Sequence, residues 1–107
     1  MSYRVQFAPE ALEQLDALEG YIAHVDSSAV AARYVDAIVA YCESLETFPE
    51  RGVRRDDLLP GLRITNYRRN AVIAFALDAG AETVTILGVF YGGRDYEAIM
   101  QGDPDSL

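Results

Sequence analysis

Arginines near the ends of predicted strands are the residues of this sequence that are best suited to binding chemistry. The planar guanidinium group can hold a carboxylate or a phosphate through two parallel hydrogen bonds. In an antiparallel sheet these strand ends could converge on one side. The pattern then predicts a surface that binds a carboxylate-rich or phosphate-bearing partner. The candidate residues for binding a target or a partner are Arg63, Arg68, Arg69, Tyr91, Arg94 and Tyr96.

A structural reading of the same arginines remains open, in which Arg94 and Asp95 pair or cap the last predicted helix and the loop arginines are solvated. Other reactive residue types favour structural roles. His24 falls near the end of a predicted helix, where a cation suits the helix dipole, and Cys42 lies on an apolar helix stripe as a buried thiol. With one histidine and one cysteine, we expect no catalytic residues, no metal site and no cofactor.

The charge of the chain is unevenly distributed. Nine arginines and 17 acidic residues give a net charge of −8, yet the segment 51–69 carries six arginines against two aspartates, a local +4. Overall acidity argues against a protein that grips nucleic-acid phosphates or binds nucleic acid sequence-specifically. No apolar run approaches the roughly 20 residues of a membrane span, and the N-terminus lacks a secretion signal. The single cysteine suggests a reducing cytoplasm.

Two helices are predicted in the first half of the chain. Alternating apolar and polar residues predict a strand over 3–7. Pro9 opens an amphipathic helix over 9–24 whose outer face is acidic. Capping residues at 26–28 begin a second helix that extends to about Thr47, before Pro49. The short link between the helices predicts an antiparallel hairpin.

The second half of the chain is predicted to form a sheet. After a loop over 49–61, alternation from Leu62 to Thr65 indicates a strand, and the apolar run 71–78 indicates a central strand. A turn leads into a strand over 82–91, in which Gly88 suggests a bulge. A short helix is expected over 94–101.

These elements give an α+β fold: an N-terminal strand, an antiparallel two-helix hairpin, and a three-stranded, mainly antiparallel sheet with a short C-terminal helix. We expect a single domain over 1–101, followed by an acidic, frayed tail at 102–107.

The order and spacing of these motifs resemble the RelE/ParE superfamily of bacterial toxins over roughly residues 3–100. The resemblance is carried by four stretches: Phe7–Ala11, Phe48-Pro49 with Leu62-Arg63, the strand AVIAFALD, and the ending Val89–Asp95. The resemblance implies a toxin neutralised by a cognate antitoxin whose tail wraps across it. RelE-like members are ribosome-dependent mRNA endonucleases, and ParE-like members are described as poisons of DNA gyrase.

The resemblance implies residue roles for each reading. In the nuclease reading Arg63, Arg94 and Tyr96 would act on RNA, but Val72 stands where a strand arginine is expected. A metal-free nuclease needs cations around the phosphate and a proton shuttle, whereas a binding protein needs only exposed complementary surface. We therefore favour a ParE-like toxin that binds DNA gyrase. The alternatives are an mRNA endonuclease and a non-toxic interaction module.

Overall fold

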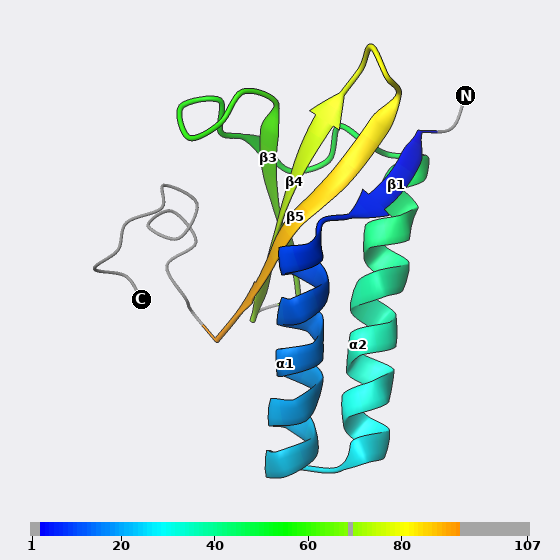
Figure 1. The fold of residues 1–107 in the computed structure, drawn as a ribbon, viewed down its shortest axis with the longest axis vertical. Helices are drawn as coiled ribbons and strands as arrows, with labels where there is room; N and C mark the ends of the chain where they lie inside the picture. Colours follow the sequence, from blue (N-terminus) through cyan, green and yellow to red (C-terminus); the bar gives the residue numbers. More distant parts are fainter. Residues whose placement is uncertain (1–2, 69, 93–107) are drawn as a thin grey trace.

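Two helices lie against one face of a five-stranded sheet (Figure 1). The computed structural model describes residues 3–68 and 70–92. Its elements are β1 (Arg4–Phe7), α1 (Pro9–Val25), α2 (Ser28–Glu43), a 3₁₀ turn (Ser44–Glu46), β2 (Val53–Arg54), β3 (Leu62–Tyr67), β4 (Ala71–Asp78) and β5 (Thr83–Tyr91). The predicted order of strand, helix hairpin and sheet is confirmed. The predicted helix 94–101 and tail 102–107 lie outside the described residues.

The sheet has the strand order β1-β5-β4-β3-β2. The β3–β4 and β4–β5 pairs are antiparallel hairpins, as expected. The prediction of three strands after the helices was one strand short, because the two-residue β2 pairs antiparallel with the start of β3. The sheet is mixed, because β1 pairs in parallel with β5, from Arg4 opposite Thr83 to Phe7 opposite Ile86.

Both helices begin where the sequence predicts. Pro9 occupies the first turn of α1, where its missing N–H is no loss, and the hydroxyl of Ser27 accepts a hydrogen bond from the Val30 N–H at the start of α2. The second helix ends at Glu43 instead of Thr47, because the chain tightens into the 3₁₀ turn before Pro49. The buried helix residues recur every three or four positions: Ala11, Leu15, Leu18 and Ile22 on α1, and Ala31, Val35, Ile38 and Cys42 on α2.

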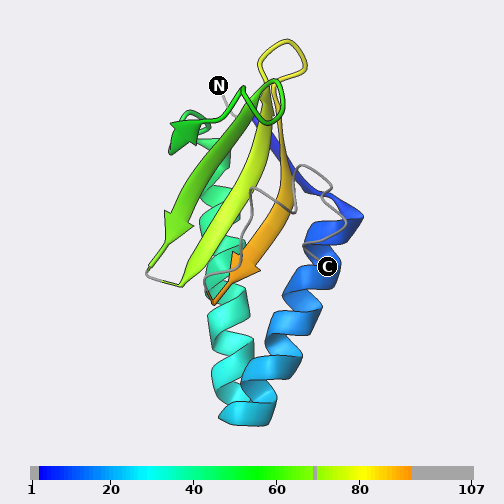
Figure 2. The same cartoon turned by 90° about the vertical axis from the view of Figure 1, so that its left-hand side faces the viewer.

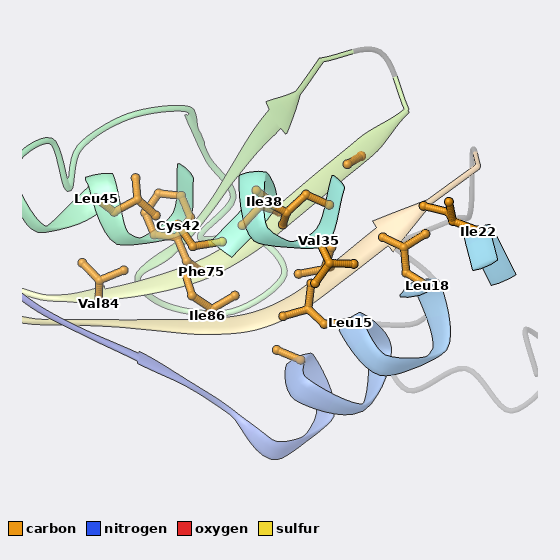
Figure 3. Packing of buried hydrophobic residues seen from close by; sticks show 14 of the residues in the cluster. Leu15, Leu18, Ile22, Val35, Ile38, Cys42, Leu45, Phe75, Val84 and Ile86 are labelled. Atoms are coloured by element: carbon orange, nitrogen blue, oxygen red, sulfur yellow. The ribbon is translucent and has the colours of Figure 1, made fainter. Parts of the chain in front are cut away.

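The main core fills the space between the helix hairpin and the sheet (Figure 3). Ile38, Phe75 and Ile86 are fully buried there, and they come from α2, β4 and β5. The opposite face of the sheet carries a second, smaller cluster around Leu62, Ile64, Ala74 and Phe90. The second view shows the sheet and the hairpin as two layers (Figure 2). The central strand β4 is therefore covered on both faces, as its apolar run predicts.

A bulge interrupts β5 beside Gly88, which confirms the prediction made from that glycine. Ala74 lies opposite Gly88 and Phe75 lies opposite Ile86, so Leu87 is the extra residue. A Cβ atom at Gly88 would lie 2.6 Å from Cζ of Phe90. The extra residue shifts the alternation of side chains between the two faces of the sheet. As a result, Val89 packs on the helix side of the sheet and Phe90 packs on the other side.

Candidate functional site

Arg68 and Tyr91, two of the predicted site residues, lie at one end of the sheet within a larger group of aromatic residues. Five tyrosine rings follow one another across this region, and we call them the tyrosine row: Tyr21, Tyr91, Tyr34, Tyr67 and Tyr41. Successive ring centroids are 5.2 to 6.4 Å apart. These separations are typical of aromatic contacts that contribute beyond simple burial.

The positions of the tyrosines follow from the secondary structure. Tyr34 and Tyr41 are seven residues apart on α2, which places them on the same face of the helix. Tyr67 is the last residue of β3 and Tyr91 the last of β5, and Ala71 of β4 lies opposite both. Because alanine is small, the rings from the two outer strands can both approach Tyr34.

Arg68 extends this surface into a groove between the helix hairpin and the sheet end. Its guanidinium carbon lies 5.2 Å from the ring centroid of Tyr67, within cation–π distance. The groove has a volume of about 490 Å³, and Arg68 lines it together with Tyr34, Tyr91 and Val25. Tyr21 and Val25 are more than half exposed. The site thus offers one cation, the carboxylate of Asp26 and several aromatic or apolar side chains to a partner.

The Tyr34 hydroxyl stays protonated at neutral pH. Burial raises the pKa of Tyr34 above its ordinary value of 10, and Tyr91 raises it further, while Arg68 acts in the opposite direction. A neutral phenol in this position can donate a hydrogen bond to a partner, but it is a poor proton acceptor. The group therefore suits recognition better than base catalysis.

Arg63 does not join Arg68, and the expectation that it would converge with the other strand ends was wrong. It lies at the opposite end of β3, five residues or about 16 Å away along the strand. Its side chain donates from Nε to the carbonyl of Arg51 at 3.1 Å and from Nη2 to the carbonyl of Glu50 at 2.6 Å. Arg63 therefore fastens the 50–52 segment to the sheet.

Three other arginines of the basic segment, Arg51, Arg54 and Arg55, also have local partners. Arg54 pairs with Asp56, and Arg55 pairs with Asp57, each at 2.9 Å. The guanidinium of Arg51 lies over the ring of Tyr41. Much of the local positive charge is thus satisfied within the loop. Three further predicted site residues lie outside the described residues: Arg69, Arg94 and Tyr96.

The residues dismissed as catalytic candidates have structural positions. Burial raises the pKa of the Cys42 thiol to about 12, so it stays protonated within the core. His24 is exposed in the last turn of α1. The acidic side chains of α1 are exposed, as predicted: Glu10, Glu13, Asp16 and Glu19. Within residues 3–68 and 70–92, no cluster of three potential metal ligands occurs, and no helix is long and apolar enough to cross a membrane.

Sequence reasoning missed most of the tyrosine row. Tyr34 and Tyr41 fall on the apolar face of the second helix, and neither they nor Tyr21 and Tyr67 were singled out as site candidates. A usable signal was present: the chain has seven tyrosines and no tryptophan, and two of the tyrosines end strands that flank β4. Combining those strand ends with the seven-residue spacing on α2 would have indicated an aromatic surface.

Comparison with known proteins gives one family and several similar folds. Residues 5–96 match the family described as the ParE toxin of type II toxin-antitoxin system, parDE. No curated protein matches the chain. Two solved structures with this fold are the chromosomal ParDE system from P. aeruginosa and the RelBE2 toxin–antitoxin complex from Mycobacterium tuberculosis. A third is the free form of an E. coli RelE mutant.

These structures share the fold with low sequence identity. The P. aeruginosa structure has a TM-score of 0.70 and 21% identity over 84% of this chain and 96% of that chain. The M. tuberculosis structure has a TM-score of 0.63 and 23% identity over 86% of this chain and 100% of that chain. The E. coli RelE structure has a TM-score of 0.61 and 15% identity over 95% of this chain and 96% of that chain. The family match covers most of the sequence, including α1, α2 and every strand from β2 to β5. The chain therefore belongs to the ParE toxin family of type II toxin–antitoxin systems.

Proposed function

We propose that this chain inhibits growth by binding a protein target, DNA gyrase, and that a cognate antitoxin neutralises it. The observation that carries the proposal is the position of Arg63. Its guanidinium is held by the carbonyls of Glu50 and Arg51, at the end of β3 remote from Arg68 and Tyr91. The guanidinium of the arginine that the nuclease hypothesis requires is therefore already hydrogen-bonded to loop carbonyls.

The other end of the sheet supports binding instead. The groove beside Arg68 combines that cation and the Asp26 carboxylate with the exposed side chains of Tyr21 and Val25. Aromatic residues and arginine are the types that contribute most at protein–protein interfaces. The protonated phenol of Tyr34 adds a hydrogen-bond donor to this surface. A protein target with acidic and apolar side chains would complement it.

Gyrase supercoiling tests the target. Purified toxin is added in stoichiometric excess to gyrase, relaxed plasmid and ATP, and we expect supercoiling to stop. Arg68→Glu should weaken inhibition by about tenfold or more, because it replaces the Arg68 cation by a second carboxylate beside Asp26. Arg4→Glu, an exposed arginine on β1, is the matched control and should inhibit like the wild type. Full supercoiling at stoichiometric excess of the wild-type toxin would remove the gyrase proposal.

The alternative nuclease function has its own readout. Primer extension on mRNA bound to translating ribosomes would reveal codon-specific cuts if the chain were an endonuclease, and we expect none. Discrete cuts that disappear on substitution of Arg63 or Arg94 would overturn the binding proposal. Induced expression without any antitoxin distinguishes the third alternative: normal growth would indicate a non-toxic interaction module.

The antitoxin is proposed by analogy with relatives. The M. tuberculosis relative was solved as a toxin–antitoxin complex. We expect the antitoxin of this chain to place acidic side chains toward Arg68 and Arg69 and apolar ones on the helix hairpin and the sheet. Replacing both arginines by glutamate should weaken the complex by about tenfold or more. Affinity equal to that of the Arg4→Glu control, measured by titration calorimetry, would mean that the antitoxin binds elsewhere.

A further inference from the structure

The strand β5 is longer than the strand that pairs with its outer edge. β1 pairs with β5 only from Thr83 to Ile86, and the chain then turns at Ala8 into α1. The last hydrogen bond of this pair runs from the Ala8 N–H to the Ile86 carbonyl. Beyond Ile86, no described strand pairs with this edge of β5. Five residues of sheet edge, 87–91, therefore extend beside α1.

The bulge at Leu87 determines which backbone groups point along this edge. The Gly92 N–H donates to the carbonyl of Asn70, so the backbone groups of Gly92 and Phe90 face β4. Alternation along the strand then turns the N–H and C=O of Val89 and Tyr91 toward α1. The Val89 N–H donates to Oε1 of Gln14 at 2.7 Å. The Gln14 side chain thus accepts a hydrogen bond that the backbone of a further strand could otherwise accept.

A cavity lies along the same edge. It has a volume of about 460 Å³ between α1 and β5, with Ala17 and Leu18 on the helix side and Val89 and Tyr91 on the strand side. Glu13 lies at this cavity too. Tyr21 and Tyr91 line both this cavity and the groove of Arg68. The two depressions are therefore adjacent.

We propose that the β5 edge at Val89–Tyr91 binds an extended segment of the antitoxin as an added strand and that Gln14 is the removable cap of this site. An extended segment fits because the edge presents successive backbone N–H and C=O groups. Another strand can form hydrogen bonds with all of them, one after another. The proposal rests on the proposed antitoxin interaction and specifies where one segment binds.

The charges along these two adjacent depressions define the chemistry of the segment. At one end, the Glu13 carboxylate favours a basic side chain. At the other end, Arg68 lines the groove together with Asp26, and its guanidinium favours an acidic side chain beside it. Between them, Ala17 and Leu18 favour apolar side chains on alternate residues. The antitoxin segment is therefore extended and apolar, with one basic and one acidic residue at opposite ends.

Amide exchange measured by NMR tests the site directly. In the free toxin the Tyr91 amide should exchange fast, while the Val89 amide is partly protected by Gln14. Saturation with the antitoxin encoded beside the toxin gene should slow exchange at Tyr91 by about tenfold or more, because the amide then lies in a sheet ladder. Formation of the complex without slowing at Tyr91 would overturn the strand-addition site and leave the antitoxin interaction intact.

Substitution of the cap gives a second, independent measurement. Gln14→Ala should tighten antitoxin binding by about fivefold, because the partner no longer competes for the Val89 N–H. Gln6→Ala is the matched control, since Gln6 also makes one side-chain hydrogen bond to β5, to Thr85 at 2.9 Å. Val89→Pro, which removes the edge N–H, should weaken binding by tenfold or more. Equal affinities for Gln14→Ala and Gln6→Ala would contradict the role of the cap.

Other occupants of the edge have distinct signatures. Protection of the Tyr91 amide that rises with toxin concentration alone would assign the edge to a second copy of the chain. Protection that is already complete in the dilute free toxin would assign it to this chain's own residues after Gly92. Either result would overturn the proposal. Failure of the antitoxin to bind at all would overturn both the proposal and the antitoxin interaction on which it rests.

Discussion

The arginines at the two ends of β3 have different environments. At its beginning, Arg63 donates to the carbonyls of Glu50 and Arg51 and holds a loop against the sheet. Just after its end, Arg68 lies over Tyr67 and lines an open groove. The residue type and the strand are the same, so the difference comes from the neighbouring chain. An irregular loop offers carbonyls at one end, and packed rings offer a surface at the other.

The comparison separates stability from recognition. A guanidinium that is saturated by backbone carbonyls has few donors left for a partner, whereas one stacked on a ring keeps its edge available. We therefore expect substitutions near Arg63 to change the free energy of unfolding and substitutions near Arg68 to change binding. Four predictions test this division, from the largest effect to the smallest.

The glycines at the two ends should differ most. Gly52, beside Arg63, has a φ of 85°, and a Cβ atom there would lie 2.3 Å from the carbonyl oxygen of Ile64. Gly52→Ala should lower the free energy of unfolding by about 3 kcal/mol, because backbone cannot move aside cheaply. Urea denaturation measures the loss.

Gly92, at the other end, is the matched control. Its φ is 74°, but among the described residues nothing lies within 4 Å of the position that a Cβ atom would take. Gly92→Ala should therefore cost only about 1 kcal/mol, the strain of a left-handed alanine. Equal losses at the two positions would mean that the loop is not closely packed against β3.

The two arginines should differ next. Arg63→Met keeps the apolar stem and removes the donors to Glu50 and Arg51, so we expect a loss of about 1.5 kcal/mol in unfolding free energy. Arg68→Met removes a cation–π contact at an exposed residue and should cost about 0.5 kcal/mol. Its effect should appear in antitoxin or gyrase affinity instead. A larger stability loss at Arg68 than at Arg63 would reverse the comparison.

Much of the fold could be predicted because its signals are local. The alternation at β1, the proline that opens α1 and the apolar run of β4 each lie within a few residues. The strand β2 has only two residues, Val53 and Arg54, and its structure exists through pairing with β3. The parallel pairing of β1 with β5 joins residues about 80 positions apart and has no local signal.

The candidate site divides in the same way. Tyr91 and Arg68 could be placed together because two hairpins fix their register on either side of Ala71. Arg63 was misplaced because it lies near the start of β3, whereas Arg68 follows its end. Its partners, carbonyls of an irregular loop, also leave no signal in the sequence, since any residue type can supply a carbonyl. The tyrosine row was missed because its rings come from four elements, and side-chain contacts of that kind depend on tertiary packing.

The tyrosine row itself should show a smaller, graded effect. The hydroxyl of Tyr41 lies 2.9 Å from Oγ1 of Thr65, which is buried, so Tyr41→Phe should cost about 1 kcal/mol. Tyr34→Phe is the matched control on the same face of α2, and loss of its hydroxyl, which lines the open groove, should be nearly neutral. Thermal unfolding compares the two. A larger loss for Tyr34→Phe would place a stabilising partner at the Arg68 end instead.

The smallest effect should be a pH dependence confined to the loop beside Arg63. The Gly61 N–H donates to Asp56 at 2.9 Å and, with the charges of Arg54 and Arg63, holds the pKa of that carboxyl below its ordinary value of 3.8. A lowered folded-state pKa stabilises the fold above pH 3.8, and this contribution disappears as the pH falls through the folded-state value.

Asp56→Asn should remove that part of the acid sensitivity, whereas Asp16→Asn, an exposed change on α1, should retain it. Urea denaturation of the three proteins from neutral to acid pH makes the comparison. If the wild type and Asp56→Asn lose stability in parallel, the carboxylate does not help to hold the loop. Anchoring would then depend on the carbonyl contacts of Arg63, and the contrast with Arg68 would rest on the guanidinium groups alone.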